Sequence, residues 1–128
     1  MNTSRVKITQ TVPLFDIADV EKSIAFYVDG LGFELQDKWV EDDVLRWCRV
    51  EHGDSALMLQ KTQGEPPVNR GPGLTLYFMC EDAKAAREEF KERGVQVGEP
   101  FVGNNMGVFY FKDPDGYQLS FESPIKQG

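Results

Sequence analysis

Few side chains in this sequence are of a type that does covalent chemistry, and they are widely spaced. His52 is the single histidine and lies in the turn sequence Val-Glu-His-Gly-Asp, where an exposed position is the ordinary interpretation. Cys48 and Cys80 occupy different apolar runs without C-x-x-C spacing, which indicates buried thiols rather than a zinc site or a disulfide framework. No Ser/His/Asp arrangement, phosphate-binding glycine loop or basic stripe is evident. The sequence therefore favours binding over nucleophilic catalysis.

Glu122 is a weak candidate for a catalytic group. It would act as a general base if burial raised its pKa toward neutrality. By two-residue alternation along a strand it shares a face with Ser120, and Gln60 has the same parity in the first half of the chain. A carboxylate and an amide alone leave most of a cation's coordination sphere unfilled, so we expect no firmly held metal there.

An internal repeat supplies the elements that position these residues. Residues 19–33 can be laid over residues 82–95, because each segment opens on an aspartate suited to helix capping and closes on a glycine. Each helix is preceded by one apolar run and followed by three, which predicts the order βαβββ twice. The predicted strands are 12–17, 33–40, 44–50 and 56–60, then 74–80, 95–102, 108–111 and 117–121.

The length of 128 residues fits one domain, since two independent units of about 60 residues would each have a marginal core. We expect a single domain over residues 1–128 of the α+β class. Its first module spans 1–62, a proline- and glycine-rich linker spans 63–73, and its second module spans 74–128.

Alternation along the strands assigns residues to two faces. Leu57, Leu59, Leu119 and Phe121 supply an apolar face for the first helix to cover. The opposite face is predicted to carry a mixed lining, which is typical of a pocket: Val12, Leu14, Met58, Gln60, Leu74, Leu76, Phe78, Ser120 and Glu122.

Charge and hydropathy limit the partners of the protein. Fourteen Lys and Arg against 21 Asp and Glu give a net charge of −7, the wrong sign for neutralising nucleic-acid phosphates and better suited to a cationic or neutral small ligand. No apolar run is long enough for a membrane span, and the N-terminus lacks the apolar core of a secretory signal. Together with two free thiols, these features predict a cytoplasmic protein.

Two motifs carry a resemblance to the vicinal oxygen chelate superfamily of glyoxalases, ring-cleaving dioxygenases and bleomycin-resistance proteins. They are Asp19-x-x-x-Ser23-x-x-Phe26-Tyr27-x-x-x-Leu31-Gly32-Phe33 and the closing Asp113-Pro114-Asp115-Gly116. The resemblance implies two βαβββ modules whose mixed sheets curl into an open groove, in a homodimer. It also implies that the enzymes' metal-ligand positions fall at Val12, Met58, Leu74 and Ser120, which offer no usual ligand for a divalent metal. No cofactor is therefore expected.

Other details look more like the metal-free bleomycin-resistance-type binding proteins. Thr11-Val12-Pro13-Leu14 is similar to their first strand, which implies exchange of residues 1–13 between subunits at Pro13; an edge-strand proline without exchange is the alternative. The segment 39–43, Trp-Val-Glu-Asp-Asp, resembles a stretch beside their binding cleft, although a solvated turn is the other interpretation. The segment 104–107, Asn-Asn-Met-Gly, departs from their Trp-Gly pair, and there Met106 could pack on an aromatic ligand.

The sequence thus predicts a metal-free protein that binds a small aromatic or cationic ligand, with antibiotic sequestration as the sharpest form of this hypothesis. The alternative is a lyase or dioxygenase of the glyoxalase type, either metal-free or with an atypical metal site. By alternation either Tyr110 or the pair Phe109 and Phe111 can face the groove. The predicted ligand-binding residues are Leu14, Trp39, Met58, Gln60, Leu76, Phe78, Met106, Tyr110, Ser120 and Glu122.

Overall fold

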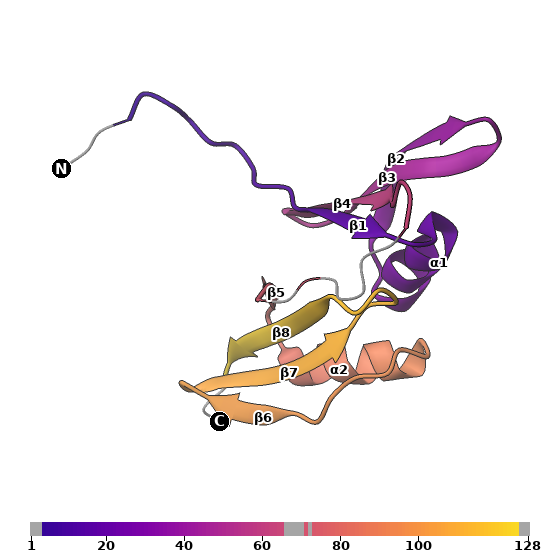
Figure 1. Ribbon diagram of the computed structural model, residues 1–128. Coiled ribbons are helices and arrows are strands. Elements are labelled where there is room, and N and C mark those ends of the chain that lie inside the picture. Colours follow the sequence, from indigo (N-terminus) through magenta and orange to yellow (C-terminus); the bar gives the residue numbers. More distant parts are fainter. Residues whose placement is uncertain (1–3, 66–70, 72, 126–128) are drawn as a thin grey trace.

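Each half of the chain forms a four-stranded sheet with one face covered. The computed structural model describes residues 4–65, 71 and 73–125 (Figure 1). The first half contains β1 (Leu14–Ile17), α1 (Val20–Ile24), the π-helix η1 (Ala25–Gly30), β2 (Glu34–Glu41), β3 (Val44–His52) and β4 (Ser55–Lys61). The second contains β5 (Thr75–Met79), α2 (Ala83–Glu92), β6 (Phe101–Gly103), β7 (Met106–Lys112) and β8 (Gln118–Pro124).

The two sheets have the same topology. Sheet A has the order β1-β4-β3-β2 and sheet B the order β5-β8-β7-β6. In each, the first strand pairs in parallel with the last strand of the half, and the remaining pairs are antiparallel. Both sheets are therefore mixed and open, and the predicted α+β class is confirmed.

Both helices begin at the aspartates that the sequence indicated. The Asp19 carboxylate accepts a hydrogen bond from the Lys22 backbone N–H, and Asp82 does the same for Ala85. Helix α1 continues as η1, where the Leu31 N–H reaches back to the Phe26 carbonyl oxygen. Gly32 follows at a φ of +82°, a left-handed conformation that glycine adopts without strain.

The segment before β6 differs from its prediction as a strand over 95–102. Only Phe101–Gly103 pairs with β7. Val95 and Val97 pack on the core instead, and the Gly98 N–H donates to the Tyr110 carbonyl oxygen at 2.8 Å. A Cβ on residue 98 would lie 2.4 Å from that oxygen, so this close approach requires glycine.

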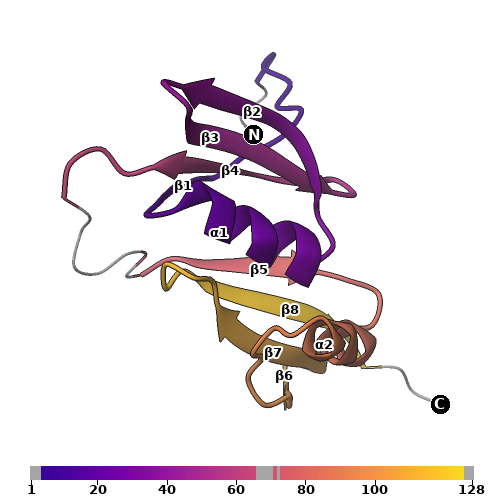
Figure 2. The same cartoon turned by 90° about the vertical axis from the view of Figure 1, so that its right-hand side faces the viewer.

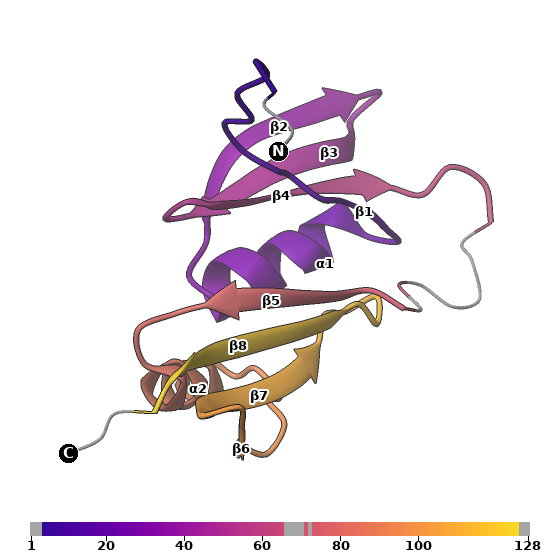
Figure 3. The same ribbon diagram turned by 90° about the vertical axis from the view of Figure 1, so that its left-hand side faces the viewer.

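One hydrophobic core joins the two halves. Helix α1 lies between sheet A and β5 (Figures 2 and 3). Phe15 of β1 stacks on Tyr117 with ring centroids 4.0 Å apart, and Phe33 meets Phe78 of β5 edge-on at 5.9 Å. The Tyr27 hydroxyl donates to the Asp113 carboxylate at 2.8 Å in the same interior. The halves are therefore packed against each other and share one interior.

The predicted module boundaries remain an expectation. The proposed linker, 63–73, falls partly on residues 66–70 and 72, which lie outside the described part of the chain. Among the described residues, none of the helices is long and apolar enough to cross a membrane.

Candidate functional site

Sheet A has one open face on the side away from α1. Trp39 pairs with Trp47 and Trp47 with Gln60, and direct cross-strand partners point to the same face. The next row on this face contains Leu14 and Met58. Leu14 is 46% exposed and Trp39 51% exposed, so apolar and aromatic surface faces solvent here. Four predicted site residues thus lie together: Leu14, Trp39, Met58 and Gln60.

Sheet B has a comparable open face. Ser120 of β8 pairs with Tyr77 of β5 on one side and with Tyr110 of β7 on the other. Glu122 and Met106 have the same strand parity as these residues. The predicted residues Met106, Tyr110, Ser120 and Glu122 therefore share this face, while Phe109 and Phe111 are buried in the core. This settles which of the three consecutive aromatic residues faces outward.

Leu76 and Phe78 do not lie on the open face of sheet B. Leu76 pairs with Leu119 and Phe78 with Phe121, and the Phe78 and Phe121 rings stack at 4.8 Å. Placing them with Ser120 was wrong by one residue of register, which moves a side chain to the other face. Tyr77 holds the outward position between them. It is 51% exposed, and it was missed because this run has large apolar side chains on both strand faces, so that only the pairing with β8 decides which set faces outward.

The two open faces point away from each other within one chain. The first half of the chain contacts the covered face of sheet B through the Phe33–Phe78 and Phe26–Phe111 ring contacts. The open face of sheet B is on the opposite side of that sheet, and α1 covers the inner face of sheet A (Figure 2). A groove lined by both open faces therefore cannot form from a single copy in this arrangement.

A cavity of about 430 Å³ lies on the open face of sheet B. It is lined by Tyr77, Phe101, Gly103, Asn104, Val108, Tyr110 and Glu122. The Phe101 ring stacks on Tyr110 with centroids 5.6 Å apart, and Phe101 is a second residue that the sequence did not single out. The hydrogen bond with Tyr77 raises the pKa of Tyr110 above that of a free phenol. The cavity combines aromatic walls with one carboxylate.

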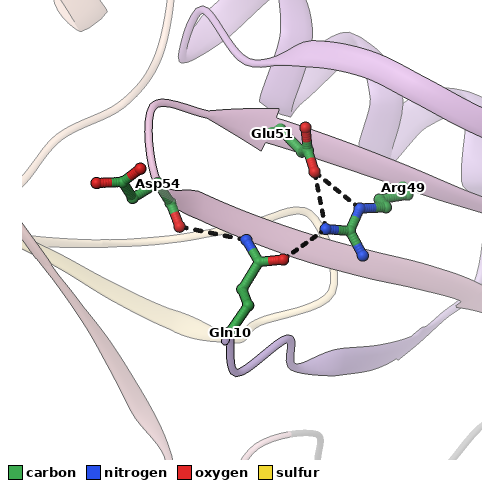
Figure 4. Close-up of polar contacts among 4 residues, drawn as sticks. All are labelled: Gln10, Arg49, Glu51 and Asp54. Atoms are coloured by element: carbon green, nitrogen blue, oxygen red, sulfur yellow. Dashed lines mark hydrogen bonds and ion pairs between the residues drawn. The ribbon is translucent and has the colours of Figure 1, made fainter. Parts of the chain in front are cut away.

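The one guanidinium on the open face of sheet A is already engaged (Figure 4). Arg49 Nε and Nη2 donate to Glu51 Oε1 at 2.9 and 2.7 Å, and Nη2 also donates to Gln10 Oε1 at 2.8 Å. Gln10 Nε2 donates in turn to the Asp54 carbonyl oxygen at 3.3 Å. Strand register also places three acidic residues on the two open faces, Asp16, Asp37 and Glu122. The basic residue that register adds there is Lys112. The charge on these faces is therefore more suited to a cation than to an anion.

The metal-ligand positions of the resembling enzymes do not fit a metal here. Thr75, rather than the predicted Leu74, shares the face of Ser120, so the four positions contain Val12, Met58, Thr75 and Ser120. Aliphatic, thioether and hydroxyl groups are poor ligands for the divalent metals of such sites. Among the described residues there is no cluster of three His, Cys, Asp or Glu side chains that could hold an ion.

The remaining candidates for chemistry are His52, the two cysteines and the acidic triplet. His52 is exposed in the β3–β4 hairpin, where its ring meets Phe33 edge-on. Burial raises the pKa of Cys48 to about 11, and burial also raises the pKa of Cys80. Neither thiol is therefore a ready nucleophile at neutral pH. Asp42 and Asp43 have φ values of 53° and 62°, so part of the acidic triplet is the tight turn between β2 and β3.

Comparison with known proteins identifies the class that this fold and site define. The sequence profile of the Glyoxalase/Bleomycin resistance protein/Dioxygenase superfamily matches residues 14–121, and the chain belongs to this superfamily. The search of curated proteins found no match.

Solved structures with the same fold include the following three proteins. TnmS3, an antibiotic binding protein from Streptomyces sp. CB03234, is 26% identical with a TM-score of 0.75, covering 96% of this chain and 100% of its own. A glyoxalase/bleomycin resistance protein from the same organism is 27% identical with a TM-score of 0.68, covering 88% and 97%. A glyoxalase family protein from Bacillus anthracis is 18% identical with a TM-score of 0.74, covering 96% and 100%.

Proposed function

We propose that this protein is a metal-free binding protein for a small aromatic cation, and that it sequesters an antibiotic of this chemistry. The observation that carries the proposal is the pair of open sheet faces, which expose aromatic and apolar side chains around a few polar groups. Small-molecule sites commonly have this mixed lining. Antibiotic binding by TnmS3, a neighbour at 26% identity, supports the same conclusion.

The proposal includes a homodimer. Sheet A of one copy would face sheet B of the other, which would bring Trp39 and Met58 opposite Tyr110 and Glu122. Support comes from the exposed aromatic surface on both faces and from their opposed directions in one chain. A symmetric pair would contain two such sites, each with residues from both copies. Exchange of the N-terminal segment at Pro13 is part of the proposal, because Val6 and Ile8 are exposed on an arm that extends from the body (Figure 1).

The chemistry of the faces supports an aromatic cation as ligand. Trp39, Trp47 and Phe101 offer flat surfaces for stacking, and aromatic faces also attract cations. Glu122 lines the cavity and supplies a negative charge. The two cysteines are free, which fits a reducing compartment, so the proposal places the protein in the cytoplasm.

A calorimetric titration with proflavine, a planar aromatic cation, tests the proposal, with the particle mass measured by light scattering. We expect a mass of twice 14.5 kDa and saturable binding near one proflavine per subunit. Metal-free bleomycin is the second titrant, and saturable binding of it would identify the antibiotic class. A monomer that gives no heat with either compound would contradict the proposal.

A pair of variants on β2 adds a control to this titration. Trp39→Ala removes an aromatic side chain from the open face, and we expect it to weaken proflavine binding at least about tenfold. Leu35 pairs with Val50 and lies on the opposite face of the same strand, so Leu35→Ala should leave the affinity unchanged. Equal losses in both variants would point to a general effect on β2 instead of a ligand contact.

A further inference from the structure

Ser120 has a hydroxyl group that the fold buries without a partner. Its side chain is 0% exposed, and Oγ is one of two buried side-chain polar atoms without a hydrogen bond among the described residues. Folded proteins rarely leave such an atom unsatisfied, because its lost hydration is not replaced. An unsatisfied hydroxyl in the middle of a candidate binding face is therefore a feature that a ligand could complete.

Two tyrosine side chains, Tyr77 and Tyr110, lie on either side of Ser120. Tyr77 and Tyr110 are the direct neighbours of Ser120 on the two adjacent strands, and their hydroxyl oxygens lie 2.7 Å apart. Two side chains that flank Ser120 and meet at their tips enclose it beneath them. Tyr77 and Tyr110 also line the cavity of about 430 Å³, and Ser120 is not in its wall. One exposed hydrogen bond thus separates the cavity from an unsatisfied hydroxyl.

Glu122 is the next polar residue after Ser120 along β8 on this face. It lies two residues beyond Ser120 on β8 with the same parity, which places the two side chains about 7 Å apart along the strand. Its carboxylate borders the cavity. A ligand that reached both groups would need an oxygen near Ser120 and a cation near Glu122.

We infer that the Tyr77–Tyr110 pair is a displaceable cover, and that the ligand carries an aromatic hydroxyl or carbonyl oxygen that separates the two phenols and hydrogen-bonds to Ser120. Its cationic group then lies beside Glu122. This inference rests on the proposed function and narrows its ligand class from aromatic cations to aromatic cations with an oxygen about 7 Å from the charge.

The test uses three small probes with the intact protein. Tyramine has both groups, phenethylamine lacks the hydroxyl, and p-cresol lacks the cation. Binding is followed by amide chemical shifts in NMR titrations. We expect tyramine to bind at least about fivefold more tightly than either of the other probes. Phenethylamine cannot make the hydrogen bond to Ser120, and p-cresol cannot make the charge contact with Glu122. Ser120→Ala should abolish the preference for tyramine over phenethylamine, and Glu122→Gln its preference over p-cresol.

Ser123→Ala is the matched control, because Ser123 is a buried serine of the same strand on the covered face, where it accepts from the Ala83 N–H at 2.8 Å. It should keep both preferences. Absence of tyramine binding, or equal preference in wild type and Ser120→Ala, would overturn the inference. Proflavine binding in the same sample would show that the proposed function stands independently of that failure.

The hydrogen bond between Tyr77 and Tyr110 can be tested without any ligand. Tyrosinate absorbance is recorded against pH for the wild type and for Tyr77→Phe. Because the hydrogen bond with Tyr77 is the largest cause of the raised pKa of Tyr110, its loss should lower that pKa. Tyr77→Phe also removes one titrating phenol, so the quantity compared is the pKa of Tyr110. An unchanged Tyr110 pKa would mean that the pair does not form in solution and would contradict the proposed cover.

Discussion

Tyr27 is the residue that most directly ties the two halves of the chain together. It is fully buried in the first half, and its hydroxyl donates to Asp113 Oδ2 in the second half. Tyr27→Phe would leave that buried carboxylate oxygen without its donor, which should lower the free energy of unfolding by about 1–3 kcal/mol. Urea denaturation followed by circular dichroism measures this loss.

Tyr77→Phe is the control for this prediction, since its hydroxyl pair is exposed and the loss should stay below about 1 kcal/mol. Equal stabilities of the Tyr27→Phe variant and the wild type would mean that the Tyr27–Asp113 bond does not join the halves in solution.

Asp113 should make the stability depend on pH in a direction opposite to that of most carboxylates. Burial raises its pKa above 3.8, and this outweighs hydrogen bonds from Tyr27 and from the Asp115 and Tyr117 N–H groups. A carboxyl with a raised pKa in the folded state binds its proton more tightly when folded. Its contribution to stability is therefore complete below its unfolded pKa and is lost as the pH rises through the folded pKa.

The Asp113→Asn variant isolates this effect, because an amide does not titrate and can still accept the two backbone N–H groups. We expect the free energy of unfolding of the variant, relative to wild type, to increase as the pH rises from about 3.5 and then to level off above the folded pKa. Urea denaturation across this pH range gives the difference. A difference that falls with rising pH would contradict the assignment.

At the scale of single residues, the strand faces of the first half were predicted correctly for Leu14, Met58 and Gln60, whereas Leu74, Leu76 and Phe78 were placed on the wrong face of the second half for one common reason. The apolar run 74–80 has large side chains on both strand faces, Leu76 and Phe78 on one and Tyr77 and Met79 on the other, so composition gives no sign of which set faces inward. Tyr77 was hidden between Leu76 and Phe78 for this reason. The register with Leu119 and Phe121 decides the faces, and it is a property of the paired strands.

Among the elements, the segment before β6 depends on a close contact between backbones. Gly98→Ala would place a Cβ against the Tyr110 carbonyl oxygen, which belongs to the backbone of β7 and cannot move aside alone. We expect a loss of about 1–3 kcal/mol in the free energy of unfolding, as for overpacked interiors. Thermal unfolding of the purified variant measures it.

Gly103→Ala is the matched control at the end of β6, where the nearest atom to an added Cβ is a Phe101 ring carbon at 3.7 Å. It should be close to wild type in stability. Similar losses in both glycine variants would show that the close approach at residue 98 is not special.

The helices were predictable because their signals are local. Asp19 and Asp82 each cap a helix with their own side chains, and glycines follow both ends. The run 95–102 was not predictable in the same way, because Val95 and Val97 pack on the core from an irregular segment and pairing begins only at Phe101. Strand-like composition does not distinguish such a segment from a true strand, since only the partner β7 decides pairing.

For the whole molecule, the central claim is that each binding site takes sheet A from one copy and sheet B from another. Trp39 belongs to the first face and Glu122 to the second. If the claim holds, Trp39→Ala and Glu122→Gln each damage both sites of their own homodimer. A mixed dimer would contain one site with both substitutions and one site with neither.

The most direct measurement is therefore proflavine binding by an equal mixture of these two variants, unfolded and refolded together to allow random pairing. Each variant alone should bind at least about tenfold more weakly than wild type. The account predicts that the mixture regains wild-type affinity at about a quarter of the sites, because half of the dimers are mixed and each holds one intact site. A mixture that regains no tight sites, from variants that each bind weakly, would place both residues in a site within one chain and contradict the account.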